Sequence, residues 1–372
     1  MNKSAQELLS ELVKIPSVSD QDNSPVIELI SSWFEKFEKN IQEWVREDGV
    51  KGKNLIVKIP GEDSGRSLVF VCHMDTVPES SDWETSPFEL IEKDRKLYGL
   101  GSCDTKGGTA AVIEAVHSLL AKPACDIFLV FSGDEEVTSA GVLKLKKEIQ
   151  FPNPQFIFIE PTDNKVLVSQ RSVLQINVVT HGTSQHGSYA TPDENNKNSA
   201  IFKMSKALAI LVEDASQNAQ VTDKLLGTNT QNLGVIQGGT ARNVMPDVCM
   251  LQIDRRLLPS IDVDHELERV KKLLLSNDPS VEVSKVIGHP SFSTSSDSLL
   301  VQNALKALDK VGIAGSIGGF QAWSEAGLFN NFKDVIILGP GSISQAHKAN
   351  EFVLQKDLED YVNVFSNIIE SL

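Results

Sequence analysis

The stretch that decides the fold reads Val71-Cys72-His73-Met74-Asp75-Thr76-Val77-Pro78, and it closes an apolar run that begins at Leu68. Consecutive apolar residues indicate a strand buried on both faces, and this strand ends abruptly in imidazole and carboxylate side chains. Two later apolar runs end in the same way, before Asp134-Glu135-Glu136 and at Glu160. Ligands of open α/β sheets bind beyond the carboxyl ends of the strands. The repeated ending therefore predicts one polar site at a single edge of a sheet.

Helices and buried strands alternate around this stretch. Helical periodicity covers residues 5–16, 25–39, 109–120, 142–147, 298–311 and 354–372, and strand-like runs cover 54–59, 67–72, 127–131, 156–159 and 335–338. Such alternation predicts an α/β domain with a mostly parallel sheet. We expect this catalytic domain to comprise residues 1–172 and 288–372.

Residues 173–287 have a different pattern. Residues 173–179 alternate between apolar and polar side chains, which indicates a strand with one solvated face. The expected order of elements is β-α-β-β-α-β, typical of a ferredoxin-like α+β unit. The α/β character returns afterwards, so we predict an inserted second domain.

Charge and composition limit the function. The net charge is -15 over 372 residues, which argues against nucleic acid or an anionic membrane as the main partner. No run of eighteen apolar residues is present, and the N-terminal residues lack an apolar signal core. The four cysteines are scattered without a C-x-x-C pair, so we expect reduced thiols in the cytoplasm and no thiolate zinc site.

The polar strand ends hold the side chains of a metal site. His73 and Asp75 point to the same side of an extended strand, and glycines around Asp104 permit tight turns that bring its carboxylate inward. Two histidines (His73 and His347) and several carboxylates suit zinc or a related divalent ion, and one carboxylate can bridge a pair of such ions. Each piece has an alternative: Asp104 as a helix N-cap, or the acids at 134–136 as the first turn of a helix.

Taken together, these motifs resemble the M20 metallopeptidases over essentially the whole chain, especially the acetylornithine deacetylase and succinyl-diaminopimelate desuccinylase group. The resemblance implies two divalent ions, with zinc preferred and cobalt or manganese as alternatives. It implies five ligands: His73, Asp104, Glu136, Glu160 and His347, with Asp104 bridging. The resemblance places His73 and Glu160 on separate ions, and likewise Glu136 and His347. It further implies that Glu135 is the general base and that Asp75 tunes His73.

For the insert, the resemblance implies a dimerisation lid and therefore a homodimer. His186 then corresponds to a lid histidine that stabilises the oxyanion, although it is otherwise an unremarkable loop histidine. Asn243 is expected to bond the acyl oxygen. Arg242 and Arg255 are candidate carboxylate anchors. The alternative for Arg255 is surface pairing with Asp254 or Asp262. Gly319 lies in the Gly318–Trp323 segment, where Phe320 and Gln321 replace the small hydroxyl and acid residues of relatives.

The expected activity is hydrolysis of the N-acyl amide of a small amino-acid derivative, with N-acetylornithine as the first candidate and a place in amino-acid biosynthesis. Desuccinylase is the runner-up, and dipeptidase or carboxypeptidase activity ranks third. A metal-free assembly protein would be expected to lack some of the ligand residues, but all five proposed ligands and Glu135 are present. A nucleotide-binding protein would need a glycine-rich phosphate loop after a strand, which the sequence lacks.

Overall fold

The computed structural model describes residues 3–372, which form two compact units. The first unit holds the chain up to Val168, together with Thr294–Gly318 and Ser324–Leu372. The second holds Ser169–Ser293 and the short segment Gly319–Trp323. That short segment belongs to the second unit, whereas the prediction placed all of residues 288–372 in the catalytic domain.

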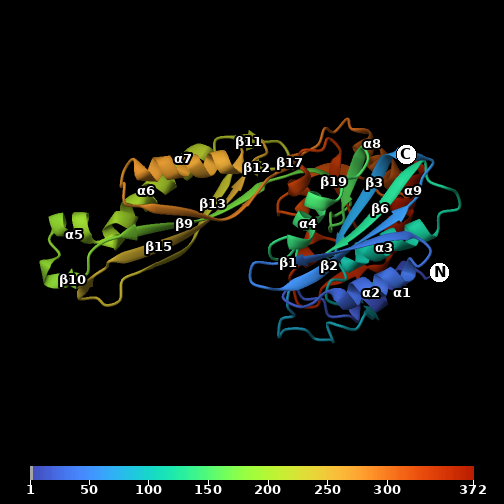
Figure 1. The fold of residues 1–372 in the computed structure, drawn as a ribbon, viewed down its shortest axis with the longest axis horizontal. Helices are drawn as coiled ribbons and strands as arrows, with labels where there is room; N and C mark the ends of the chain where they lie inside the picture. Colours follow the sequence, from blue (N-terminus) through green and yellow to red (C-terminus); the bar gives the residue numbers. More distant parts are fainter. Residues whose placement is uncertain (1–2) are drawn as a thin grey trace. The chain divides into compact units, whose positions relative to one another are not determined.

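A mixed sheet forms the centre of the first unit (Figure 1). Its strands lie in the order β1 (Glu38–Val45), β2 (Lys51–Ile59), β6 (Cys125–Ser132), β3 (Asp63–His73), β7 (Pro154–Phe158), β19 (Val335–Ile337) and β8 (Lys165–Gln170). The short β17 (Phe292–Ser293) and β18 (Ser316–Phe320) also pair with β8. The four central strands β6, β3, β7 and β19 are parallel, and the flanking pairs are antiparallel. The parallel centre agrees with the prediction and sets the edge at which the polar strand ends meet.

The helices of the first unit are α1 (Ala5–Val13), α2 (Ser24–Trp33), α3 (Lys106–His117), α4 (Ala140–Glu148), α8 (Leu299–Lys310) and α9 (Gln355–Glu370). Helix α1 begins with a reciprocal capping box between Ser4 and Glu7. Helix α3 contacts both α1 and α9, and ten of its twelve residues are buried. A helix buried on nearly all sides explains why small residues dominate α3.

The predicted helix over 25–39 is too long. Helix α2 ends at Trp33, and the chain enters strand β1 at Glu38. Phe34 and Phe37 continue the helical spacing of apolar residues in the sequence. In the structure they lie in the turn between the two elements, where their rings meet edge to face with centroids 5.8 Å apart. In β1 only Gln42 and Trp44 are buried, so no apolar alternation marked this strand in the sequence.

The second unit has the predicted β-α-β-β-α-β order: β9 (Ser172–His181), α6 (Ala200–Asn218), β13 (Thr230–Gly238), β15 (Val248–Leu257), α7 (Val263–Leu275) and β16 (Glu282–His289). Its antiparallel sheet has the order β13-β15-β9-β16. Helices α6 and α7 lie over one face of this sheet, with which they share an apolar core (Figure 1). This strand order is that of a ferredoxin-like unit.

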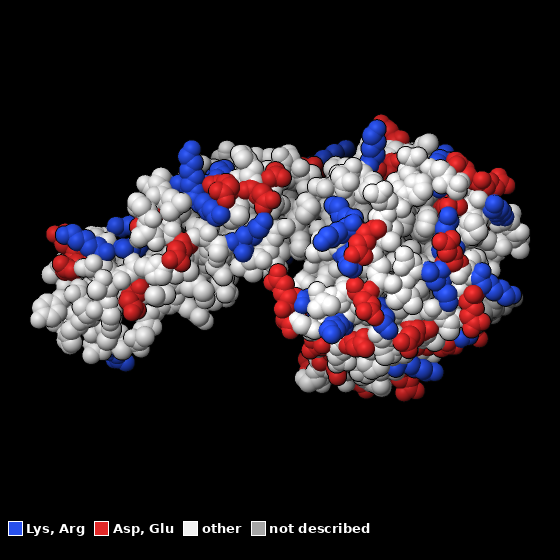
Figure 2. All heavy atoms as spheres, in the orientation of Figure 1, with Lys and Arg blue, Asp and Glu red and all other residues white. Residues whose placement is uncertain are grey.

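On the face drawn in Figure 2, lysine and arginine side chains are interspersed with aspartate and glutamate. They do not gather there into one continuous basic surface of the kind that nucleic acids require. None of the helices within residues 3–372 combines the length and apolar character that a bilayer span requires.

Candidate metal centre

The three polar strand ends meet in the first unit because β3 lies between β6 and β7. His73, the last residue of β3, is in register with Ser132, the last residue of β6. Val71 is in register with Phe158 of β7, and Glu160 follows two residues later. Parallel pairing therefore delivers His73, the acids at 134–136 and Glu160 to one edge, as the sequence predicted.

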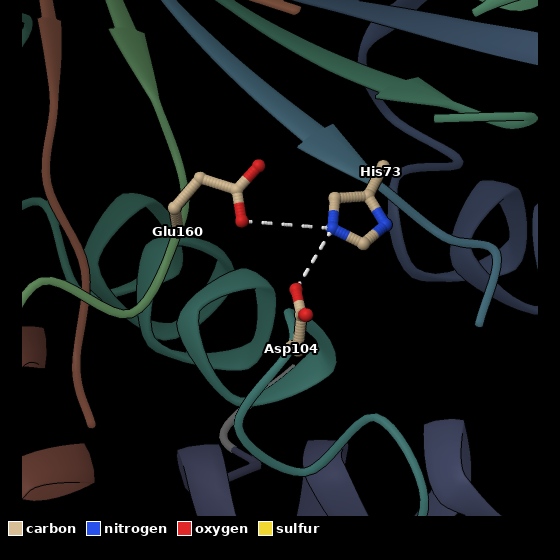
Figure 3. A group of neighbouring side chains, drawn as sticks. All are labelled: His73, Asp104 and Glu160. Carbon is tan, nitrogen blue, oxygen red and sulfur yellow. Dashed lines mark hydrogen bonds and ion pairs between the residues drawn. The ribbon is translucent and has the colours of Figure 1, made fainter. Parts of the chain in front are cut away.

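The first group of potential ligands consists of His73, Asp104 and Glu160. The Nε2 atom of His73 lies 3.2 Å from Asp104 Oδ1 and 3.8 Å from Glu160 Oε2 (Figure 3). Its Nδ1 atom lies 3.1 Å from the carbonyl oxygen of Asp75. A carbonyl can only accept a hydrogen bond, so this contact places a hydrogen on Nδ1. Burial opposes the charged form, but Asp104, Asp75 and Glu160 raise the pKa of His73 well above its usual value. A cation that displaces the proton from Nε2 would leave Nδ1 protonated, which is the tautomer that a metal ligand needs.

The second group consists of Asp104, Glu136 and His347. The Nε2 atom of His347 lies 2.8 Å from Glu136 Oε2 and 3.8 Å from Asp104 Oδ2. Within each group, the candidate ligand atoms lie within 4.8 Å of one another. The expectation that His73 and Glu160 bind separate ions is therefore wrong, because both belong to the first group. The same holds for Glu136 and His347, which share the second group. Asp104 belongs to both groups and faces the two histidines with different oxygens. This is the arrangement of a carboxylate that bridges two cations.

The electrostatics of the cluster favour a cation. Burial raises the pKa of Glu160 to about 7, and Asp104 and Glu136 add to the rise while His73 opposes it. Burial also raises the pKa of Glu136. The hydrogen bond with Glu136 raises the pKa of His347 to about 9. Crowded carboxylates that hold protons at neutral pH release them when a divalent ion supplies the missing positive charge. The imidazole and carboxylate donors fit zinc, cobalt or manganese.

The carboxylate of Asp75 connects His73 to the Glu135–Glu136 turn. Its oxygens accept the backbone N–H groups of Glu135 and Glu136, each at 3.2 Å. The hydroxyl of Ser19 donates to the same carboxylate at 2.7 Å. His73 Nδ1 lies 3.7 Å from Asp75 Oδ1, farther than from the Asp75 carbonyl. Asp75 thus orients the imidazole mainly through its backbone, and its side chain holds the acidic turn.

The Glu135 side chain lies among other acidic side chains. Among residues 3–372, no protein group donates a hydrogen bond to its carboxylate, and only its backbone N–H is engaged, with Asp75. Burial raises the pKa of Glu135 well above its usual value, and the neighbouring Glu160 adds to the rise. A carboxylate with a raised pKa and no hydrogen-bonding partner is suited to accept and return a proton.

Asp134, the first acid of the run, has a structural role. Its carboxylate accepts hydrogen bonds from Arg46 Nη1 at 2.9 Å and from the backbone N–H of Ala140, at the start of α4, at 3.0 Å. Its φ of 75° lies in the left-handed region, where the carbonyl can accept the N–H of Ser139 at 2.6 Å. The alternative of an acidic first turn is wrong for this residue, because α4 begins at Ala140 and its first turn contains no acid.

Two buried acids near the centre were not singled out in the sequence. Glu351 binds backbone N–H groups of the loop that carries Asp104. Glu325 is 2% exposed, and its Oε2 accepts from the Ser132 hydroxyl at 3.3 Å. Burial raises the pKa of Glu325 well above its usual value, and Asp75 adds to the rise. Glu325 lies two residues after Trp323, and no sequence pattern distinguished it from other acids.

Three predicted residues lie together in the second unit. Strand β10 (Gln185–His186) pairs with β14 (Val244–Met245), and the N–H of Gly187 donates to the carbonyl of Asn243 at 2.8 Å. His186, Asn243 and the adjacent Arg242 are exposed. The Nδ1 atom of His186 accepts the backbone N–H of Ser188 at 3.2 Å. The hydrogen of neutral His186 is therefore on Nε2, which is free to donate.

Arg255 does not have the position of a substrate anchor. Its side chain is 1% exposed and lies 2.8 Å from Asp214 Oδ2 and 2.9 Å from Glu266 Oε1. Arg269 contacts the same two acids, so the four residues form an ion-pair cluster that links β15 to α6 and α7. The prediction of a carboxylate anchor is wrong for Arg255 because its guanidinium is already buried between carboxylates of its own unit.

Gly319 packs closely within the second unit. A Cβ at this position would lie 2.6 Å from a methyl carbon of Leu226 and 3.1 Å from Leu225. Close packing accounts for the glycine, and the expected substrate contact stays a prediction.

Comparison with known proteins agrees with this geometry. Residues 69–371 match the model of "Peptidase family M20/M25/M40". The chain is 30% identical to an acetylornithine deacetylase of Myxococcus xanthus over 367 residues, which cover 94% of this chain and 92% of that protein. It is 29% identical to an acetylornithine deacetylase of Pectobacterium carotovorum, over 98% of this chain and 96% of that protein.

Solved structures share the fold. A tripeptidase of Staphylococcus aureus superposes with a TM-score of 0.81 at 22% identity, covering 100% of this chain and 98% of that one. A dinuclear metal-binding M20 peptidase of Bacillus subtilis gives a TM-score of 0.73 at 15% identity, covering 98% of this chain and 96% of that one. The chain therefore belongs to peptidase family M20/M25/M40 and is a hydrolytic enzyme that acts on amide bonds.

Proposed function

We propose that this enzyme removes the acyl group from an N-acyl amino acid with the help of two divalent metal ions, and that N-acetylornithine is its substrate. The observation that carries the proposal is the pair of ligand groups that share Asp104, with the unpaired Glu135 on the same turn as the ligand Glu136. The acetyl group and ornithine follow the relatives named acetylornithine deacetylase.

His73 and Glu160 would hold one ion, Glu136 and His347 the other, and Asp104 both. Zinc is the proposed metal, with cobalt or manganese as alternatives. Bound ions would polarise the acyl carbonyl and lower the pKa of a water molecule at the site.

The side chains of the protein then move the proton. Glu135 accepts it from the attacking water and returns it to the nitrogen of the leaving amine. Asp75 holds Glu135 and Glu136 in place through their backbone N–H groups. We assign the Nε2–H of His186 and the amide of Asn243 to the oxyanion, and Arg242 to the substrate carboxylate. The exposure of these three side chains supports the assignment.

A homodimer through the second unit is part of the proposal. Strand β13 is an edge strand of its sheet, and its residues Val235 and Ile236 are 40% and 53% exposed. An edge strand with exposed apolar side chains is a surface on which another chain can pair. Light scattering of the protein and of a Val235→Lys, Ile236→Lys variant tests this. We expect a dimer for the former and a monomer for the latter.

The cytoplasm is the proposed site of action. The four free, buried cysteines are consistent with this compartment.

Hydrolysis of a substrate panel by the metal-loaded enzyme tests the activity. The panel contains N-acetylornithine, N-acetylcitrulline, N-acetylmethionine, N-succinyl-diaminopimelate and several dipeptides. We expect the highest kcat/KM for N-acetylornithine. Preference for the succinyl compound would establish a desuccinylase, and preference for dipeptides would establish a peptidase like the solved structural neighbours.

A further inference from the structure

Glu351 binds the loop that carries the bridging aspartate. Its Oε1 accepts the backbone N–H groups of Cys103 at 2.7 Å and Asp104 at 2.9 Å, and its Oε2 accepts that of Gly101 at 2.9 Å. Gly101 has a φ of 78°, a conformation that glycine adopts without strain. The loop thus turns three N–H groups toward one carboxylate, which is a backbone anion site filled by a side chain of the same chain.

No basic side chain within residues 3–372 bonds to the buried carboxylate of Glu351. Glu351 is 2% exposed. The nearby buried Lys106 donates instead to the carbonyl groups of Leu12 at 3.1 Å and Ile15 at 3.0 Å. Burying a carboxylate is costly unless hydrogen bonds satisfy it, and here three backbone groups do so. An uncharged side chain would form weaker hydrogen bonds with the three N–H groups of this loop, because charge-assisted hydrogen bonds are about twice as strong as neutral ones.

Glu351 also connects the two segments that hold ligands of the second group. It lies four residues after His347 and directly before β20 (Phe352–Leu354), which pairs with β5 (Lys96–Tyr98). The backbone of Glu351 accepts the N–H of Gly99 at 3.1 Å. Its carboxylate and its carbonyl therefore both fasten the loop leading to Asp104.

We propose that Glu351 is a positioning residue of the metal centre: its carboxylate fixes the loop from Gly101 to Asp104 so that the two oxygens of Asp104 face both ligand groups at once. This inference rests on the proposed two-metal function. The Glu351 carboxylate bonds to the backbone N–H of Asp104 and acts on the ligand through that backbone.

Metal binding by Glu351→Gln tests the inference without reference to turnover. Asp126→Asn is the matched control, because Asp126 is also buried and accepts a backbone N–H, from Gly61 at 2.8 Å. Asp126 lies at the opposite end of β6 from Ser132. Cobalt titration followed by visible absorption, with competition by a chelator, measures the affinity and number of ions. Thermal unfolding of the metal-free proteins measures the loss of stability.

We expect both variants to lose thermal stability, but only Glu351→Gln to lose metal affinity, by about 10–100-fold as for other residues that orient ligands. Its kcat should fall with little change in KM. If Glu351→Gln does not fold, the same titration of Glu351→Asp decides, since the shorter side chain keeps the charge but cannot reach all three N–H groups.

Metal binding equal to that of Asp126→Asn would overturn the inference. If the unmodified protein binds two ions and Glu351→Gln binds them equally well, only the role of Glu351 is wrong. If the unmodified protein does not bind two metal ions, the proposed function itself is wrong, and the inference is wrong with it.

Discussion

The two units hold their functional candidates in different ways. In the first unit, His73, Asp104 and Glu160 are all less than 9% exposed, and protein groups orient them before any ligand arrives. In the second unit, His186 and Asn243 are exposed on a two-stranded ribbon. The difference teaches that burial alone does not identify a functional charge: buried His73 is a candidate ligand, whereas buried Asp134 and Arg255 have structural contacts. Metal ligands must be preorganised, whereas residues that contact a substrate must remain accessible.

The largest expected effect is that of Glu135→Gln, because a general base contributes about 10²–10⁴-fold to the rate. The change should lower kcat by this amount while the bound metal, measured by elemental analysis, stays the same. Glu148→Gln, at the exposed end of α4, is a control that should retain full activity. Retained activity of Glu135→Gln would remove Glu135 from the mechanism.

Arg255→Ala tests the structural side of the comparison. Removing one partner of a buried ion pair costs about 3–5 kcal/mol of stability, since Asp214 and Glu266 would remain buried with less compensation. Arg256→Ala is the matched control, because Arg256 pairs with Asp254 at the surface and is 30% exposed. Its loss should cost about 0–1 kcal/mol. Urea unfolding measures both values. A changed KM in Arg255→Ala with unchanged stability would restore Arg255 as a substrate anchor.

His186→Ala should lower kcat by about 10²–10³-fold, the effect of losing one oxyanion donor, and should leave metal content unchanged. His265→Ala, an exposed histidine of α7 in the same unit, should be without effect. Loss of metal together with activity in His186→Ala would make this residue a ligand rather than an oxyanion donor.

A further expected effect concerns the pH dependence of metal affinity. The pKa of Glu160 is raised to about 7 and that of His347 to about 9, so the metal-free site holds protons at neutral pH. A divalent ion must displace them, and its apparent affinity should rise with pH by about tenfold per unit for each proton released. Affinity should thus increase from pH 6 to 9 in chelator competition. Affinity independent of pH over this range would show that these groups do not bind the metal.

The sequence predicted that the polar strand ends meet at one sheet edge, because strand ends can be read from apolar runs. His73, the acids after β6, and Glu160 each follow such a run, and parallel pairing brings them together. Asp134 and Glu135 could not be told apart in this way, since the left-handed backbone at Asp134 and its bond to Arg46 are tertiary features.

What the sequence could not reveal depends on partners without a sequence signature. Glu351 bonds to backbone N–H groups, which every residue but proline possesses. Arg255 and Arg256 are neighbours in sequence, yet the alternation of β15 buries the first and leaves the second partly exposed. The choice of Arg255 as a substrate residue failed because the carboxylates that surround it come from two other elements, helices α6 and α7.

The central claim is that Asp104 is shared by two metal ions. Counting bound ions by elemental analysis and chelator competition tests it in the unmodified protein and in three variants, His73→Ala, His347→Ala and Asp104→Ala. The two ligand groups predict two ions for the unmodified chain, loss of one in each histidine variant, and weakened binding of both in Asp104→Ala. An Asp104→Ala protein that keeps either ion with undiminished affinity would contradict the bridge and the proposed two-metal centre.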